Sequence, residues 1–334
     1  MHQKVQTICT IGPACFDFET LEQLVISGMD IARFNFSHAT YDQFTEGKKI
    51  LEELNKKHDK TVKTLIDLRG PRIRIGELPK AGVELKEGEL ILFSTDSSNK
   101  EAIPIDDPYL HLNVKENHPM FLSNGDIELI IENKHNTEII ARVIRGGVLY
   151  SRKAVNLPDT NLTTAGLTEK DRKDTQFAVS HSADYIAQSF VKNKSDVEEL
   201  RPFLKGTNAQ IIAKIESKQA IHNLAEIIQA TDLVMVARGD LGIELPLEKL
   251  PLLQKDIISQ AKKHQKRAIV ATQMLMSMVN HFRPTRAEVS DVANAVLDGA
   301  WGLMLSDETA FGRYPVESLV YLIKTIRAVE ESRL

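Results

Sequence analysis

Short apolar runs rich in β-branched residues alternate with longer amphipathic stretches along most of the chain. Eight of the short runs are typical of buried strands, and they span residues 5–11, 29–35, 62–68, 184–189, 210–215, 232–237, 267–272 and 301–305. Helical spacing of apolar positions is found in 20–27, 43–54, 168–180, 196–204, 219–228, 250–263, 287–297 and 316–329. Strand alternating with helix predicts a parallel sheet, and eight such units close a (β/α)8 TIM barrel.

The first helical stretch carries signals at both of its ends. Thr20 and Gln23 have the spacing of a capping box, in which side chains satisfy the free amide groups of a first turn. Gly28 follows the last apolar position and is typical of a helix stop. We therefore expect the helix to start at this capping box and to end at Gly28.

One long region between the third and fourth strands breaks the pattern. From 72 to 156, short runs of alternating apolar and polar residues are separated by glycines, and Asn124-Gly125 is a hairpin signal. We expect a small all-β domain inserted after barrel strand 3, with bounds of 72–156, and a barrel formed by 1–71 and 157–334. Removing the insert leaves roughly 250 residues, which is the size of a complete barrel.

Composition narrows the classes of function. A formal net charge of −4, with both signs interspersed, gives no electrostatic reason to expect a nucleic-acid or membrane partner. The two cysteines, Cys9 and Cys15, are too few for a disulfide framework, and the first residues lack the apolar stretch of a signal peptide. No apolar run reaches the ~18 residues of a membrane span. We expect a cytoplasmic protein.

Polar and ionisable residues gather where the predicted strands end. Barrels build their active sites at the carboxyl ends of their strands, so these positions are the candidates for chemistry. They are Arg33, Asn35, Asp67, Ser189, Lys214, Glu216, Arg238, Gly239, Asp240, Thr272 and Ser306.

Lys214 and Glu216 are two residues apart and therefore point to the same face of their strand. Asp240 follows the next strand, so Glu216 and Asp240 can meet across neighbouring strand ends. Two carboxylates with few other ligands suit Mg²⁺ or Mn²⁺, which prefer oxygen and keep positions open for substrate phosphate. An ordinary ion pair between Lys214 and Glu216 explains the same spacing equally well. Residues 239–242 are either a plain turn or a turn whose amide groups hold a carboxylate.

Nine segments of the chain resemble the pyruvate kinase family, in the family's order and across the whole barrel. They are QTICTIGPA at 6–14, SGMDIARFNFSH at 27–38, LIDLRGPRIR at 65–74, KAVNLP at 153–158, AKIES at 213–217, VARGDLGIELP at 236–246, ATQMLMSM at 271–278, RPTRAEVSDVANAVLDGA at 283–300 and LSDETAFGRYP at 305–315. The resemblance implies a glycolytic phosphotransferase that moves the phosphoryl group of phosphoenolpyruvate to ADP, giving pyruvate and ATP.

On the phosphoenolpyruvate side, the resemblance implies catalytic and substrate-binding roles. Lys214 would neutralise the transferred phosphoryl group, and Arg33 would bind the phosphate of phosphoenolpyruvate. Thr272 would stand near the substrate methylene, and Ser306 would belong to the proton path. The substrate carboxylate would meet backbone amides of the turn formed by Ala237, Arg238, Gly239 and Asp240.

The other residues implied by the resemblance hold cations and the nucleotide. The divalent metal, Mg²⁺ or Mn²⁺, would be bound by Glu216 and Asp240. The side chains that hold K⁺ in the family match Asn35, Ser37 and Asp67. The nucleotide phosphates bind in the family where this chain has Asn35, Arg74 and Lys153.

Several residues depart from the family's pattern. Arg72 stands where many members carry glutamate or lysine, and because the lysine versions manage without K⁺, we expect a fixed guanidinium to replace the ion. On the ADP side, Ser123-Asn124 replaces an acidic pair and Arg69 replaces a lysine. The chain ends at Leu334, after the last predicted barrel helix, so we expect the family's C-terminal domain and its effector site to be absent.

These departures leave alternatives open. One is a related metal–enolate barrel enzyme that uses phosphoenolpyruvate or an oxoacid with an acceptor other than ADP. Another is a non-catalytic binding protein that kept the fold, although buried unpaired charges are costly to retain without a use. The segment 283–296 resembles a barrel-to-barrel surface of the family and predicts a homodimer.

Overall fold

Eight parallel strands close into a barrel at the centre of the computed structural model, which describes residues 4–332. In barrel order they are β1 (Gln6–Thr10), β16 (Gly302–Leu305), β15 (Arg267–Ala271), β14 (Leu233–Ala237), β13 (Gln210–Ile215), β12 (Tyr185–Gln188), β3 (Lys63–Asp67) and β2 (Ile31–Asn35). Each lies within one of the eight strands predicted from the sequence. The prediction of a TIM barrel is confirmed.

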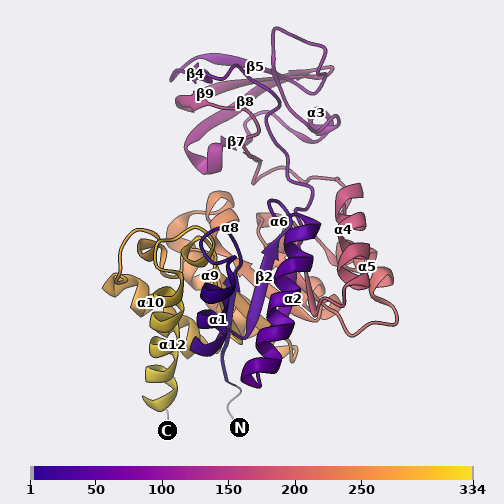
Figure 1. Cartoon of the computed structure of the whole chain (residues 1–334). Helices are drawn as coiled ribbons and strands as arrows, with labels where there is room; N and C mark the ends of the chain where they lie inside the picture. The colour runs from indigo at the N-terminus through magenta and orange to yellow at the C-terminus, as the bar shows by residue number, and fades with distance from the viewer. Residues whose placement is uncertain (1–3, 333–334) are drawn as a thin grey trace.

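Helices form the outer layer of the barrel (Figure 1). They are α1 (Phe18–Ser27), α2 (Tyr41–His58), α4 (Glu169–Ser180), α5 (Lys194–Leu200), α6 (Lys218–His222), α7 (Leu224–Ala230), α8 (Arg238–Glu244), α9 (Leu250–Lys263), α10 (Arg286–Asp298), α11 (Asp307–Ala310) and α12 (Pro315–Ser332). Within residues 4–332, no helix combines the length and the apolar character needed to cross a membrane.

The predicted start of α1 was wrong, whereas its predicted end is confirmed. The N-cap is Asp17, whose Oδ1 accepts a hydrogen bond from the backbone N–H of Thr20 at 2.8 Å. Aspartate caps a helix as well as threonine does, so the helix starts at Phe18 and the proposed box at Thr20 falls inside the first turn. Gly28 closes the helix in the left-handed region at φ 113°, which glycine adopts without strain.

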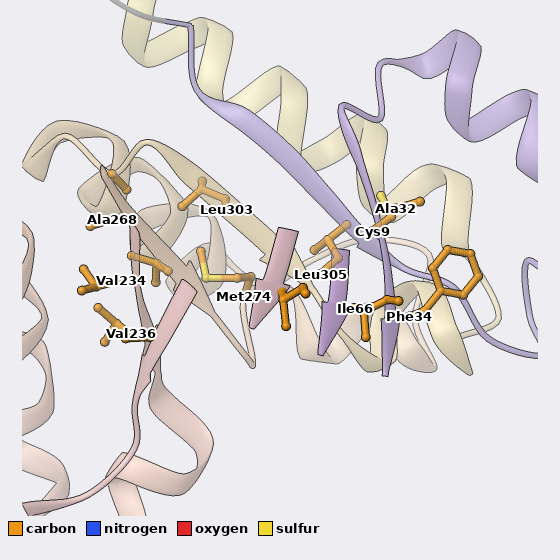
Figure 2. Close-up of a cluster of buried hydrophobic side chains, with 14 of the residues drawn as sticks. Cys9, Ala32, Phe34, Ile66, Val234, Val236, Ala268, Met274, Leu303 and Leu305 are labelled. Atoms are coloured by element: carbon orange, nitrogen blue, oxygen red, sulfur yellow. The ribbon is translucent and has the colours of Figure 1, made fainter. Parts of the chain in front are cut away.

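Alternation along the strands builds two apolar layers. Met235 of β14 points into the barrel, where it packs in a central cluster with Ile8 and Ile269. Its neighbours Val234 and Val236 face outward, toward the helices. Figure 2 shows members of this outer layer on several strands, among them Val234, Leu303 and Ile66. This packing fixes the strand ends that carry the polar residues.

A separate β domain is inserted between β3 and α4, and we call it the inserted β domain. Its strands are β4 (Val83–Leu85), β5 (Leu90–Ser94), β6 (Ile103–Pro104), β7 (Pro119–Leu122), β8 (Ile127–His135), β9 (Glu138–Arg145), β10 (Gly147–Leu149) and β11 (Val155–Asn156). A short helix, α3 (Leu110–Asn113), and the 3-10 turn η1 (Ser123–Gly125) complete it.

The inserted β domain has its own core and stands over one end of the barrel. Residues such as Phe93, Leu129 and Val143 pack in a cluster distinct from those of the barrel. Figure 1 shows this domain above the barrel, with both ends of the chain at the opposite end. Because the insert leaves from the carboxyl end of β3, it covers the same end of the barrel where the predicted site residues lie.

Candidate active site

A cavity of about 150 Å³ opens at the carboxyl ends of the barrel strands. Most of the predicted site residues line it, namely Arg33, Asn35, Ser37, Asp67, Arg72, Arg74, Lys214, Glu216, Ala237, Asp240 and Thr272. Four others, Lys153, Arg238, Gly239 and Ser306, do not line it. The strand ends therefore bring a mixed group of cations and carboxylates to one small space.

Asp67, at the end of β3, is the buried centre of this group, with a side chain that is only 1% exposed. Its Oδ2 accepts a hydrogen bond from Nε of Arg33 at 2.9 Å and forms an ion pair with Nη2 at 2.8 Å, so the guanidinium binds side-on. Its Oδ1 lies 3.1 Å from Nζ of Lys214 on β13. Ser189 follows β12, between these strands, and accepts from Lys214 at 2.7 Å. One network thus joins the ends of four neighbouring strands.

Burial and neighbouring charges shift the pKa values of Asp67 and Lys214 in opposite directions, and the combined effect of the charges is the larger. Burial alone would raise the pKa of Asp67, but the adjacent Lys214 and Arg33 hold that pKa below its ordinary value. Burial alone would lower the pKa of Lys214, but the carboxylates of Asp67 and Glu216 hold it above its ordinary value. Lys214 is therefore a protonated ammonium group, able to neutralise an anion in the cavity.

Two further carboxylates, Glu216 and Asp240, face the same cavity. Glu216 is 1% exposed, and its Oε1 lies 3.0 Å from Nζ of Lys214 while its Oε2 accepts from the backbone N–H of Phe190 at 2.8 Å. Burial raises the pKa of Glu216, and the charge of Asp240 adds to this effect against the opposing pull of Lys214. Asp240 forms an ion pair with Arg72 at 2.7 Å. The ion pair between Lys214 and Glu216 therefore exists and lines the cavity, whereas metal binding by Glu216 stays a prediction.

The two carboxylates fit a hard divalent cation. Within residues 4–332, no group of three or more histidine, cysteine or acidic side chains converges as a complete metal site. Mg²⁺ is ordinarily held by one or two carboxylates, with water and substrate phosphate as the other ligands. Burial is the main cause of the raised pKa of Glu216, and a cation beside the two carboxylates would offset both that burial and the added charge of Asp240. A pair of carboxylates in a cavity is therefore a sufficient donor set.

The loop after β15, two strands from the strand of Lys214, forms part of the cavity wall. Thr272 has φ 72°, and its hydroxyl accepts from the backbone N–H of Gly239 at 2.8 Å. The side chain of Arg238 turns away from the cavity, where it donates to the carbonyl of Thr272 at 2.7 Å and pairs with Asp291 at 2.6 Å. Arg238 thus supports the loop, while Thr272 lines the cavity and its hydroxyl donates to the carbonyl of Ala271 at 2.6 Å. Ser306 follows β16, and its buried Oγ has no hydrogen-bond partner in the described part of the chain.

Of the residues expected to hold K⁺ and nucleotide, Asn35 ends β2 and Ser37 lies between β2 and α2, whereas Asp67 is the buried centre of the network. Asn35 and Ser37 are linked by a 3.1 Å hydrogen bond from the Ser37 N–H to the Asn35 side chain. Arg74 lines the cavity and donates to the carbonyl of Arg152 at 2.9 Å. Lys153 is exposed and lies outside the cavity lining.

Three contributors to the site were not predicted as site residues. Thr10 accepts from Arg33 Nη1 at 2.8 Å, Phe190 orients Glu216 through its N–H, and Asn124 of η1 accepts from Arg72 at 3.3 Å. Thr10 could have been found, because it is the last but one residue of the predicted strand 5–11 and pairs with Arg33 on the next strand. Phe190 gives no sequence signal, since it acts through its backbone, and Asn124 meets the barrel only through the tertiary fold.

This fold and this site define a class, a TIM barrel with a cation-rich centre suited to anionic substrates. A family model described as pyruvate kinase, barrel domain, matches residues 2–319. The chain is 43% identical to a pyruvate kinase of Geobacillus stearothermophilus over 328 residues and 39% identical to one of Thermococcus litoralis over 334 residues. The chain belongs to the pyruvate kinase family.

The fold of the family extends over nearly the whole chain, but the relatives are longer. The alignments cover 96% of this chain and 56% of the Geobacillus protein, and 99% of this chain and 70% of the Thermococcus protein. A crystal structure of a pyruvate kinase from Cryptosporidium parvum matches with a TM-score of 0.95 and 36% identity, over 99% of this chain and 70% of that one.

A partly buried carboxyl group outside this network, Glu244, lies at the end of α8. It accepts from the side chain of Asn156 on β11 at 3.3 Å, beside a cavity of about 50 Å³ under the inserted β domain. Burial raises the pKa of Glu244 to about 7, an effect that Asn156 opposes and the charges of Asp240 and Asp159 increase. The neutral acid is therefore the favoured form in the fold at acidic pH.

Glu244→Gln should change the pH dependence of stability. Because the folded pKa exceeds the unfolded one, this group stabilises the fold fully below about pH 4.5, and that contribution is lost as pH rises through 7. Between pH 5 and pH 8, the free energy of unfolding of the parent should therefore fall by up to about 3 kcal/mol more than that of the variant. Denaturant unfolding at both pH values in EDTA measures this, with the exposed Glu248→Gln as control. Parallel pH profiles in parent and Glu244→Gln would contradict the assignment.

Proposed function

We propose that this protein transfers the phosphoryl group of phosphoenolpyruvate to ADP, giving pyruvate and ATP. The observation that carries this proposal is the convergence of the Lys214 ammonium and the Glu216 and Asp240 carboxylates on one cavity that also contains Arg33. A phosphoryl group in flight and the enolate it leaves are both anionic, so fixed cations matter more than covalent chemistry.

In this proposal each residue has a defined task. Glu216 and Asp240 hold a divalent ion, Mg²⁺ or Mn²⁺, which when bound supplies Lewis-acid polarisation of substrate oxygens. Lys214 neutralises the oxygens of the transferred phosphoryl group, and Arg33 binds them before transfer. Thr272 places a hydroxyl where a proton can be relayed to the methylene carbon, with Ser306 further along the same path.

The remaining substrate contacts follow the same assignment. The substrate carboxylate meets the turn formed by Ala237, Arg238, Gly239 and Asp240, where it would share the Gly239 N–H with the hydroxyl of Thr272. The nucleotide phosphates lie against Asn35, Arg74 and Lys153. Two observations favour the alternative of a different acceptor. Lys153 lies outside the cavity, and Asn124 is already paired with Arg72.

A direct assay decides between these functions. The protein is mixed with phosphoenolpyruvate, Mg²⁺ and ADP, and both pyruvate and ATP are followed. Equal amounts of the two products support the proposal. Pyruvate without ATP favours a metal–enolate enzyme with another acceptor, and tight ligand binding without any turnover favours a non-catalytic binding protein.

Lys214→Met should abolish phosphoryl transfer, because it removes the ammonium group that Asp67 and Glu216 hold in the cavity. We expect a loss of about 10³-fold or more in rate. Metal-dependent enolisation of pyruvate, followed by exchange of its methyl protons in D₂O, should partly survive. Lys218→Met on α6, outside the cavity, is the control. Transfer at the parent rate in Lys214→Met would show that the assigned role is wrong.

We also propose that K⁺ is unnecessary for activity. Arg72 brings a guanidinium to the cavity that Asn35, Ser37 and Asp67 line, so the positive charge of a K⁺ ion is already supplied. Steady-state rates should be unchanged when K⁺ is exchanged for an inert large cation. Strong activation by K⁺ would contradict this role of Arg72.

We infer that the protein forms a homodimer through the barrel surface around α10, in a reducing cytoplasm. The exposed apolar side chains of Met276 and Phe282, just before α10, and of Leu252 on α9 support this inference. Cys9 and Cys15 are free and buried, in keeping with a reducing compartment. Sedimentation velocity at micromolar concentration should give twice the 37.5 kDa chain mass. A single 37.5 kDa species would contradict the dimer.

A further inference from the structure

Lys214 has three partners inside the protein, one for each N–H of its ammonium group. Its Nζ lies 3.1 Å from Oδ1 of Asp67 and 3.0 Å from Oε1 of Glu216. The third contact is a hydrogen bond at 2.7 Å to Oγ of Ser189, which follows β12 and also lines the cavity. Because an ammonium group has only three N–H donors, an oxygen of a phosphoryl group must share or take over one of them.

Ser189 differs from the other two partners because it carries no charge. Asp67 and Glu216 are each 1% exposed, so withdrawing the ammonium group from either would leave a buried carboxylate with less positive charge beside it. Giving up the contact with a hydroxyl leaves only a neutral oxygen. The N–H that points to Ser189 is therefore the one that the fold can transfer most readily to an anionic ligand.

The oxygen of Ser189 is oriented as an acceptor by its own proton. The hydroxyl lies 2.7 Å from the carbonyl oxygen of Leu68 and 3.3 Å from Oδ1 of Asp67. A hydroxyl has one proton and two lone pairs, and the shorter contact is the better place for the proton. With the proton directed at Leu68, a lone pair remains for the N–H of Lys214. Ser189 is 2% exposed, so bulk water has little access to this position.

The backbone around Ser189 fixes that oxygen in place. A side chain at Gly70, which has φ 70°, would have its Cβ 2.8 Å from the Cβ of Ser189, closer than real contacts allow. Phe190 has φ 56°, a left-handed conformation that a bulky residue rarely adopts. This turn presents the hydroxyl of Ser189 to Lys214, and it presents the next N–H to Glu216 at 2.8 Å. Strained backbone of this kind persists where the surrounding structure holds it, and it is concentrated at functional sites.

We propose that Ser189 is a positioning residue for phosphoryl transfer. Its Oγ keeps the third N–H of Lys214 directed away from the two carboxylates and toward the cavity wall, where an oxygen of the transferred phosphoryl group can take that N–H over. Without this acceptor, the ammonium group would settle closer to Asp67 and Glu216 and meet the phosphoryl group in a poorer geometry. The inference rests on the role of Lys214 in the proposed function, but it does not depend on which acceptor receives the phosphoryl group.

Ser189→Ala removes the acceptor and leaves every charge of the site in place. It should lower kcat by about ten- to a hundredfold, as expected for a lost hydrogen bond to a charged group. The KM for phosphoenolpyruvate should change by less than about threefold, because the contact matters most while the phosphoryl group is being transferred. Steady-state kinetics with ADP and Mg²⁺ measure both constants. Ser195→Ala on α5, which removes an exposed hydroxyl outside the cavity, is the control and should behave like the parent.

A second readout follows the ammonium group itself and needs no catalysis. With lysine labelled by ¹⁵N at Nζ, the buried ammonium group of Lys214 should give a slowly exchanging signal in nuclear magnetic resonance spectra, identified by its loss in Lys214→Met. In Ser189→Ala its protons should exchange with water at least about fivefold faster, because one of its hydrogen bonds is gone. Ser195→Ala should leave the signal unchanged.

These outcomes separate the inference from the function on which it rests. Parent kcat in Ser189→Ala would overturn the positioning role. A reduced kcat with an unchanged Lys214 signal would overturn it as well, because the serine would then support the fold rather than act through the lysine. A parent protein that forms no ATP would instead overturn the proposed acceptor, and the resonance experiment would still show whether Ser189 holds the ammonium group.

Discussion

The buried carboxylate of Asp67 is the constraint on which the rest of the site depends. Removing a charge from water costs several kcal/mol, and that cost is offset only when partners bind the charge with good geometry. Asp67 meets this condition with Arg33 on one oxygen and Lys214 on the other. Asp67 thereby holds Arg33 and Lys214, two cations that would otherwise repel each other, next to one another in the cavity.

Pairing extends from Asp67 across the whole cavity. Lys214 serves both Asp67 and Glu216, and Arg72 serves Asp240, so every carboxylate of the site already has a cation. An anionic substrate that entered alone would disturb this balance. Entry of an anion together with a divalent cation preserves it, which gives a physical reason for two carboxylates to lie in a site otherwise built to attract negative charge.

The sequence predicts the barrel well because its determinants are local and repeated. Period-two alternation places Lys214 and Glu216 on one face of β13, and strand-end position brings Asp240 to the same rim. The alternation cannot tell which way a side chain turns after its strand ends, so it does not reveal that the side chain of Arg238 supports the loop at Thr272. The contacts of Phe190 and Asn124 depend on the tertiary fold, which no local pattern encodes. The N-cap of α1 was misplaced because both Asp17 and Thr20 have capping side chains.

The central claim is that the Asp67 network holds Lys214, Glu216 and Asp240 around one metal and one phosphoryl group. The most direct test is a crystal structure with Mn²⁺ and phosphoenolpyruvate, with the metal located by its anomalous scattering. The account predicts one strong peak in contact with the carboxylates of Glu216 and Asp240, and the substrate phosphate against Lys214 and Arg33. A peak elsewhere, or a phosphate bound away from Lys214, would contradict it.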